Sequence, residues 1–215
     1  MTKLWAAAAA FLLAGCNIAY SPTPMFSPAD ADPAAHLKPG VWRTDKNCAG
    51  RKSASHCEPE DGAMLVTATS IHFLKADGSP EKDAAAWPYL IVRGTPMLMQ
   101  AKVESMDDAH KDEMYAFATL EPLTRDHDGT ITRTRLWLVE CGPPEKHAAN
   151  DNARVPTEGK NALPGMTMVG RDCIPRDRAV LFDAAARSRA WADELVTIYW
   201  AGARSQPVAG GGAAR

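Results

Sequence analysis

Five cysteines are the residues best suited to chemistry in this chain, because a thiolate is a nucleophile, a metal ligand and a disulfide partner. They stand at positions 16, 48, 57, 141 and 173, so their number is odd. No two of them form the Cys-x-x-Cys pair that is typical of thioredoxin-like redox sites and of structural zinc sites. We therefore expect no redox dithiol, no metal site and no other cofactor.

The first cysteine, Cys16, follows a stretch that is typical of an export signal. Lys3 precedes an apolar run from Leu4 to Gly15. A helix of this length rises only about 18 Å, whereas the hydrocarbon core of a bilayer is about 30 Å thick. Residues 1–15 are therefore predicted to be a cleaved signal peptide rather than a permanent membrane span.

The end of this signal, Leu13-Ala14-Gly15-Cys16, resembles the lipobox of bacterial lipoproteins. The resemblance implies that the thiol of Cys16 takes a diacylglyceryl chain, and that acyl chains such as palmitate hold the protein on a membrane of the cell envelope, facing the periplasm. Asn17 is not the Asp that retains members of this family in the inner membrane, so the outer membrane is favoured. The alternatives are a secretory signal with an incidental cysteine and a buried apolar helix.

The other four cysteines are predicted to form disulfides, because an even number in an exported chain is typical of a disulfide framework. Three pairings are possible, and we favour Cys48–Cys57 together with Cys141–Cys173. The first pair would close a short loop that is too polar to fold by burial. The second would join the end of an apolar strand to the segment before the last helix.

Three further fragments carry residues that do chemistry in other proteins. Ser79-Pro80-Glu81-Lys82 has the letters of Ser-x-x-Lys, but its proline predicts a polar turn. Asp126-His127-Asp128-Gly129 begins like a calcium loop, but position twelve is Trp137, so a hairpin turn is expected. The acidic run 107–113 contains Lys111, which opposes cation binding. With no metalloprotease, nucleophile-elbow or phosphate-loop motif, we predict no catalytic residue.

Composition and charge bound the class of protein. The chain has 215 residues, of which 46% are hydrophobic and 23% charged, with a formal net charge of −2. This length is enough for one domain with a substantial core. The near-neutral charge argues against a nucleic-acid partner.

The chain is predicted to contain one domain between two less ordered segments. Residues 16–38 include four prolines and are expected to form a lipidated, Pro-rich tether that holds the domain off the membrane. Residues 39–203 are expected to form a single α+β domain. Residues 204–215 are expected to be a disordered tail.

Within the domain, strands precede one helix. Residues 97–104 alternate between apolar and polar side chains, which is typical of a half-buried antiparallel strand. Further strands are expected over residues 40–44, 64–74, 87–93, 114–123, 130–141 and 166–173. Residues 178–201 carry apolar positions at helical spacing behind Asp177, a suitable N-cap. The predicted fold is an antiparallel meander sheet of about 6–7 strands with one C-terminal amphipathic helix packed on it.

Two resemblances concern the domain itself. Three segments of the domain are similar to small uncharacterised alphaproteobacterial lipoproteins: Gly40-Val41-Trp42, the Leu-Trp-Leu-Val-Glu-Cys-Gly-Pro-Pro segment that begins at Leu136, and the Cys173 segment before the helix. This resemblance implies no activity. Gly40-Val41-Trp42 near the start of a β domain with a late helix also resembles lipocalins. That resemblance implies an eight-stranded barrel, whereas about seven strands are expected here.

The sequence therefore predicts a lipid-anchored envelope protein that acts as a non-catalytic binding or structural module. Its partners would be the membrane, through Cys16, and an unidentified envelope protein or ligand. The first alternative is a lipocalin-like carrier of a small hydrophobic ligand, and the second is a periplasmic enzyme with an unfamiliar site. A carrier requires a closed barrel with an apolar interior, an enzyme requires converging polar groups, and an interaction module requires an exposed apolar patch.

Overall fold

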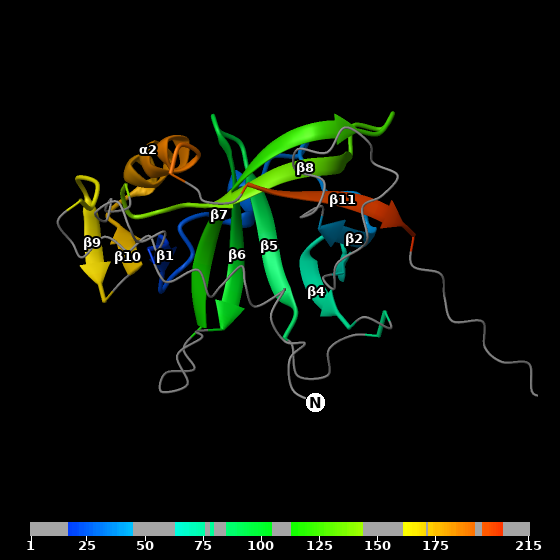
Figure 1. Cartoon of the computed structure of the whole chain (residues 1–215), viewed down its shortest axis with the longest axis horizontal. Coiled ribbons are helices and arrows are strands. Elements are labelled where there is room, and N and C mark those ends of the chain that lie inside the picture. Colours follow the sequence, from blue (N-terminus) through cyan, green and yellow to red (C-terminus); the bar gives the residue numbers. More distant parts are fainter. Residues whose placement is uncertain are drawn as a thin grey trace, which may run out of the picture.

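The computed structural model describes residues 17–44, 63–75, 78–79, 85–104, 113–143, 161–170, 172–191 and 195–203. Eight antiparallel strands close into a barrel, and an outer layer with one α-helix covers one side of it (Figure 1). The prediction of an antiparallel sheet with a single α-helix is confirmed. The prediction of an open meander of 6–7 strands is wrong, because the last strand pairs with the first and closes the sheet.

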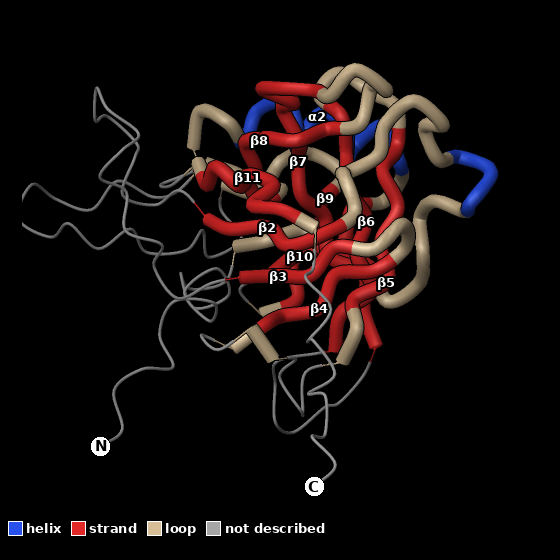
Figure 2. Tube along the Cα trace, turned by 90° about the vertical axis from the view of Figure 1, so that its right-hand side faces the viewer, coloured by secondary structure: helices blue, strands red, loops and turns tan. Residues whose placement is uncertain are grey.

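The barrel strands follow one another around the barrel in chain order, and the succession from β8 through β11 and β2 to β5 can be followed in Figure 2. The eight strands are β2 (Gly40–Thr44), β3 (Ala63–Val66), β4 (Ser70–Leu74), β5 (Trp87–Val92), β6 (Met97–Glu104), β7 (Glu113–Arg125), β8 (Ile131–Leu138) and β11 (Val196–Gly202). Strand β11 lies between β8 and β2 and is antiparallel to both.

The segment 64–74, predicted as one strand, contains two strands. This segment is a hairpin of β3 and β4, and the hydroxyl of Thr67 stabilises its turn. Thr67 Oγ1 accepts hydrogen bonds from the backbone N of Thr69 at 3.2 Å and of Ser70 at 2.9 Å. Because a threonine side chain satisfies these backbone groups, the turn needs neither glycine nor proline. The apolar alternation therefore continues across it without a sequence signal.

The segment 178–201, predicted as one helix, contains a shorter helix and most of a strand. Helix α2 covers only Arg178–Ser188, and β11 follows it. Residues 196–200 are Val-Thr-Ile-Tyr-Trp, a run of β-branched and aromatic residues that favours a strand. Asp177 is the N-cap of α2, as predicted, and accepts a hydrogen bond from Val180 N at 2.9 Å.

The outer layer packs on the barrel through a second apolar cluster. It contains α2, the hairpin of β9 (Met166–Val169) and β10 (Asp172–Pro175), and the short strand β1 (Tyr20–Ser21), which pairs with β7. These elements lie together at the left of Figure 1. Phe117 and Leu98 point outward from the barrel into this cluster, where they meet Leu181 of α2. The segment predicted as one strand over 166–173 is thus a hairpin outside the barrel.

Residues 17–38, called the strap below, correct the prediction of a tether. The strap lies along the barrel, and its Ala19 and Phe26 are buried. The backbone N of Met25 and of Phe26 both donate to Oε1 of the buried Gln100, at 2.9 and 3.0 Å. A short 3-10 helix, η1 (Pro28–Asp30), follows. The prolines of the strap therefore stand in an ordered segment that is built into the fold.

Candidate functional site

The barrel is closed at one end by the strap. Residues 31–38 cross this end from the β5–β6 connection to β8. Asp32 N donates to Ile91 O at 2.8 Å, and Ile131 N donates to His36 O at 2.7 Å. Leu37, which is 1% exposed, points into the barrel and packs in one cluster with Trp42. This end of the barrel is therefore filled with side chains.

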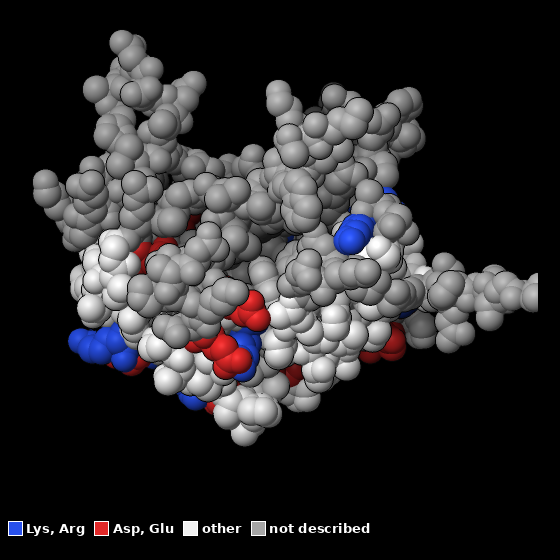
Figure 3. Space-filling view, turned by 90° about the horizontal axis from the view of Figure 1, so that it is seen from below, with Lys and Arg blue, Asp and Glu red and all other residues white. Residues whose placement is uncertain are grey.

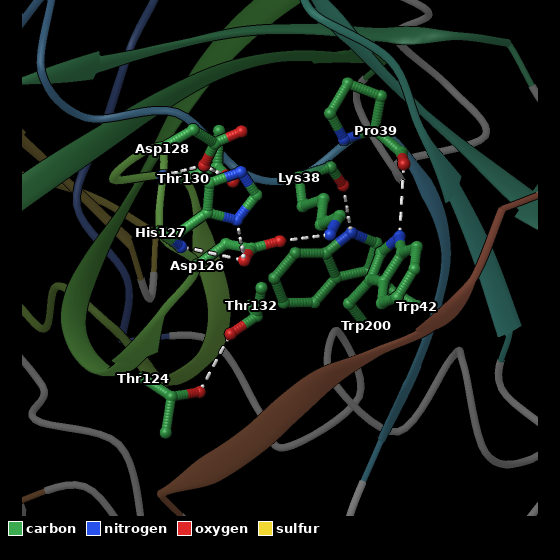
Figure 4. A network of polar contacts seen from close by, with 10 residues as sticks. All are labelled: Lys38, Pro39, Trp42, Thr124, Asp126, His127, Asp128, Thr130, Thr132 and Trp200. Carbon is green, nitrogen blue, oxygen red and sulfur yellow. Dashed lines mark hydrogen bonds and ion pairs between the residues drawn. The ribbon is translucent and has the colours of Figure 1, made fainter.

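A polar network outside the closed end holds the strap in place (Figure 4). Lys38 forms an ion pair with Asp126, and its Nζ lies 4.2 Å from the ring centre of Trp200. The indole N–H groups of Trp42 and Trp200 donate to the carbonyl oxygens of Lys38 at 2.7 Å and Pro39 at 3.1 Å. Two tryptophans from the paired strands β2 and β11 thus bind the end of the strap at the seam that closes the barrel.

Glycine is required at position 40 of this seam. Gly40 has φ +139°, a conformation that other residues rarely adopt, and a Cβ there would lie 2.5 Å from both Gly202 O and Trp200 Nε1. The Gly-Val-Trp tripeptide thus has a physical role. Gly40 lets β11 approach β2, and Trp42, which is fully buried, fills the closed end.

Three carboxylates hold the strap through charged partners, and we call them the strap carboxylates: Asp30, Asp32 and Asp126. Hydrogen bonds from Ser27 and then Arg178 lower the pKa of Asp30. A hydrogen bond from Arg93 lowers the pKa of Asp32. The ammonium group of Lys38, with the backbone N–H of His127, lowers the pKa of Asp126 well below its ordinary range. All three therefore hold the strap in their ionised form.

Toward the other end, the residues that face into the barrel become more exposed. On β4, Ile71 is buried and Phe73 is half-buried, and on β8, Thr134 is buried and Leu138 is half-buried. The same change occurs along six of the eight strands, and the inward-facing half-buried residues at this end are Thr44, Met64, Phe73, Trp87, Tyr89, Met114, Ala116, Ala118, Leu136 and Leu138. On the other two strands, β6 and β11, the change is reversed: Val103 and Val196 are buried toward this end, whereas Met97 and Trp200 are half-buried at the closed end. We call this end of the barrel the open end. Exposure of inward-facing side chains means that solvent reaches the barrel interior from there.

Among the described residues, the side chains that face into the barrel are mostly apolar and none is charged. Methionine and aromatic residues supply much of its lining in the described strands, and Phe73 and Trp87 contact each other edge to face with ring centres 4.7 Å apart. Two polar side chains inside have partners: Tyr89 OH donates to Thr67 O at 3.0 Å, and Thr134 Oγ1 donates to Glu121 O at 3.1 Å. Burial raises the pKa of Tyr89 to about 12, so this phenol is neutral at physiological pH.

The predicted cysteine sites stand as follows. Cys16, Cys48 and Cys57 lie outside the described residues, so lipidation and the first disulfide stay predictions. Cys141 and Cys173 lie at disulfide distance with their Cα atoms 5.7 Å apart, which is the geometry that the second predicted pair requires.

The other predicted fragments are placed only in part. Residues 126–129 form the β7–β8 turn, as predicted, with Gly129 N donating to Asp126 O at 2.9 Å. Glu81, Lys82 and residues 107–112 lie outside the described part of the chain. Within the described ranges, no three His, Cys, Asp or Glu residues gather as metal ligands would.

Two further findings concern surface charge and membrane-spanning helices. In the view from below (Figure 3), acidic and basic side chains occur in small mixed groups rather than as a face of one sign. In the segments that the structure describes, no helix has the length and apolar character needed to span a bilayer.

A barrel interior was expected only under the lipocalin-like alternative, and the residues that line it were not identified from the sequence, although one signal for them was present. Residues 97–104 were expected to alternate, and their odd-numbered members do face inward. A single strand, however, does not reveal that its apolar face meets seven others around a common axis.

The fold defines the class as an eight-stranded up-and-down β-barrel, an architecture that lipocalins share. Comparison of the chain with protein-family models, with curated proteins and with solved structures gave no match.

Proposed function

We propose that this protein is a lipid-anchored carrier that holds one small, uncharged, apolar molecule inside its barrel. The observation that supports this most is the change in exposure along the inward-facing residues. On six of the eight barrel strands they are buried toward the end that Leu37 and Trp42 fill, and half-buried and mostly apolar at the open end. An eight-stranded barrel has an interior of a size that side chains fill or that one small ligand occupies.

The lining favours apolar ligands and can adapt to ligands of different shapes. Met64, Met97 and Met99 contact the interior cluster. Methionine side chains are flexible and polarisable, so they adapt to ligands of irregular outline. A charged ligand group would have no described partner of opposite charge among the inward-facing residues and would have to stay at the open end.

An interaction module, the function predicted first from the sequence, has less support. Such a module requires an exposed apolar patch of several hundred Å². Among the described residues, the large hydrophobic side chains that are exposed are Leu123 and Val169. They lie on different elements, β7 and β9, and do not form one patch.

Binding of a neutral apolar fluorophore, N-phenyl-1-naphthylamine, tests the proposal. We expect saturable binding with one molecule per chain. Ala118→Trp places an indole inside the barrel and should weaken binding at least tenfold. Ala201→Trp makes the same change at an exposed position of β11 and should leave binding unchanged. Absence of binding by the natural protein, or equal binding by both variants, would contradict the proposal.

Anchoring is the second part of the proposal, and its support is the lipobox sequence that ends at Cys16. Two or three acyl chains bind a bilayer firmly, whereas one chain binds only marginally. Cys16→Ser removes the acceptor thiol, so the protein should move from the membrane fraction to the soluble fraction. If the variant stays with the membrane, the anchor is not at Cys16.

A further inference from the structure

The strap is attached to the protein from its first described residue. Asn17 is 9% exposed. Its backbone O accepts a hydrogen bond from Cys141 N at 2.9 Å, and its Nδ2 donates to Gly142 O at 3.1 Å. Ile18 N donates to Asp172 Oδ1 at 3.1 Å. The chain is thus held against the outer layer as soon as it leaves position 16.

This attachment leaves no spacer between the proposed lipid and the folded domain. Neighbouring Cα atoms are about 3.8 Å apart, so the backbone of residue 16 lies within one residue of a buried position. A tether of twenty residues in polyproline geometry would have allowed about 60 Å. A bilayer that receives acyl chains from Cys16 must therefore lie against the outer layer near Asn17.

An exposed apolar residue stands at this place. Val169, at the end of β9, pairs with Asp172, the residue whose carboxylate holds Ile18. Val169 is 47% exposed. A single exposed valine is ordinary on a protein surface, but this one stands beside the proposed anchor.

We propose that the lipidated protein rests directly on the bilayer and that the end of the β9–β10 hairpin, with Val169, contacts the lipid. This inference rests on the proposed anchoring at Cys16 and adds the orientation that the anchor imposes. The hairpin lies at the left of Figure 1, whereas the β7–β8 turn, near Leu123, lies at the upper right. Leu123 is an internal control, because it is exposed and apolar and lies near the turn that leads into the start of β8, whereas Asn17 binds Cys141 and Gly142 beyond the other end of β8.

Photocrosslinking in vesicles tests this orientation. The full lipidated protein is reconstituted in phosphatidylethanolamine and phosphatidylcholine with a small share of diazirine-bearing phosphatidylcholine, and the crosslinked peptides are identified by mass spectrometry. We expect lipid adducts on the peptide that contains Val169 and at least tenfold fewer on the peptide that contains Leu123. A variant with about twenty Gly/Ser residues between Cys16 and Asn17, a spacer of about 25 Å, should lose the Val169 adducts.

Each outcome decides a separate point. Similar labelling of the two peptides, or labelling at Val169 that the spacer does not reduce, would overturn the proposed orientation. The contrast between Val169 and Leu123 in the natural protein decides this even where the spacer variant fails to fold. The mass of the N-terminal peptide shows independently whether Cys16 carries lipid. A peptide without lipid would contradict the anchoring, whereas a lipidated peptide with no adducts at Val169 would contradict only the orientation.

Discussion

Replacing Leu37 by alanine should strongly destabilise the protein, because the strap fills the closed end of the barrel. Leu37 is 1% exposed and packs among the interior residues around Trp42. The substitution removes three buried carbon groups, which at about 0.8 kcal/mol each amounts to about 2.4 kcal/mol. The space left behind adds to this cost, so we expect the free energy of unfolding to fall by about 3–4 kcal/mol.

Urea denaturation followed by tryptophan fluorescence and circular dichroism measures this change. Leu123→Ala is the matched control, since Leu123 is 38% exposed and should lose less than about 0.5 kcal/mol. If residues 17–38 were a tether, both variants would behave like the natural protein. A loss below about 1 kcal/mol for Leu37→Ala would refute the conclusion that the strap is part of the barrel.

Three further predictions concern closure of the barrel, acidity and the outer layer. Gly40→Ala should destabilise the protein by about 2 kcal/mol or more in the same urea assay, because the Cβ would overlap Trp200 and force an unfavourable φ. The strap carboxylates have lowered pKa values, so their contribution is complete above their ordinary pKa near 3.8 and is lost as the pH falls toward the lowered values. The urea midpoint should therefore drop between about pH 4 and pH 2, whereas a midpoint that is constant in this range would show that these ion pairs do not hold the strap. Non-reducing peptide mapping should show that Cys141 is bonded to Cys173, and a link from either to another cysteine would reject the pairing. Changing both to serine should lower the free energy of unfolding by about 3–4 kcal/mol.

Parts of the fold follow from local sequence. The alternation over residues 97–104, the Asp-Gly turn at 128–129 and the Asp177 N-cap are set by neighbouring residues, so they were predicted correctly. The strap was not, because its prolines indicate an extended chain but do not indicate what that chain lies against. Its order comes from distant partners such as Gln100 and Arg93.

Closure of the barrel also depends on distant contacts. Residues 196–200 fit the apolar spacing of a helix, but they form a strand because β8 and β2 offer backbone partners on both sides. The candidate binding site inside the barrel also depends on contacts between strands that are distant in the sequence. Phe73, Trp87 and Leu138 each face inward in their own strand, and only the closed register brings them to one interior.

Methionine methyl resonances give the most direct test of an apolar binding site inside the barrel. The chain has nine methionines, of which Met64, Met97, Met99 and Met114 face inward and Met25, Met166 and Met168 lie in or near the outer layer. Adding N-phenyl-1-naphthylamine to protein labelled at the methionine methyl groups should shift the inward-facing set and leave the outer set in place. Shifts confined to the outer set, or no shifts at saturating probe, would contradict the account.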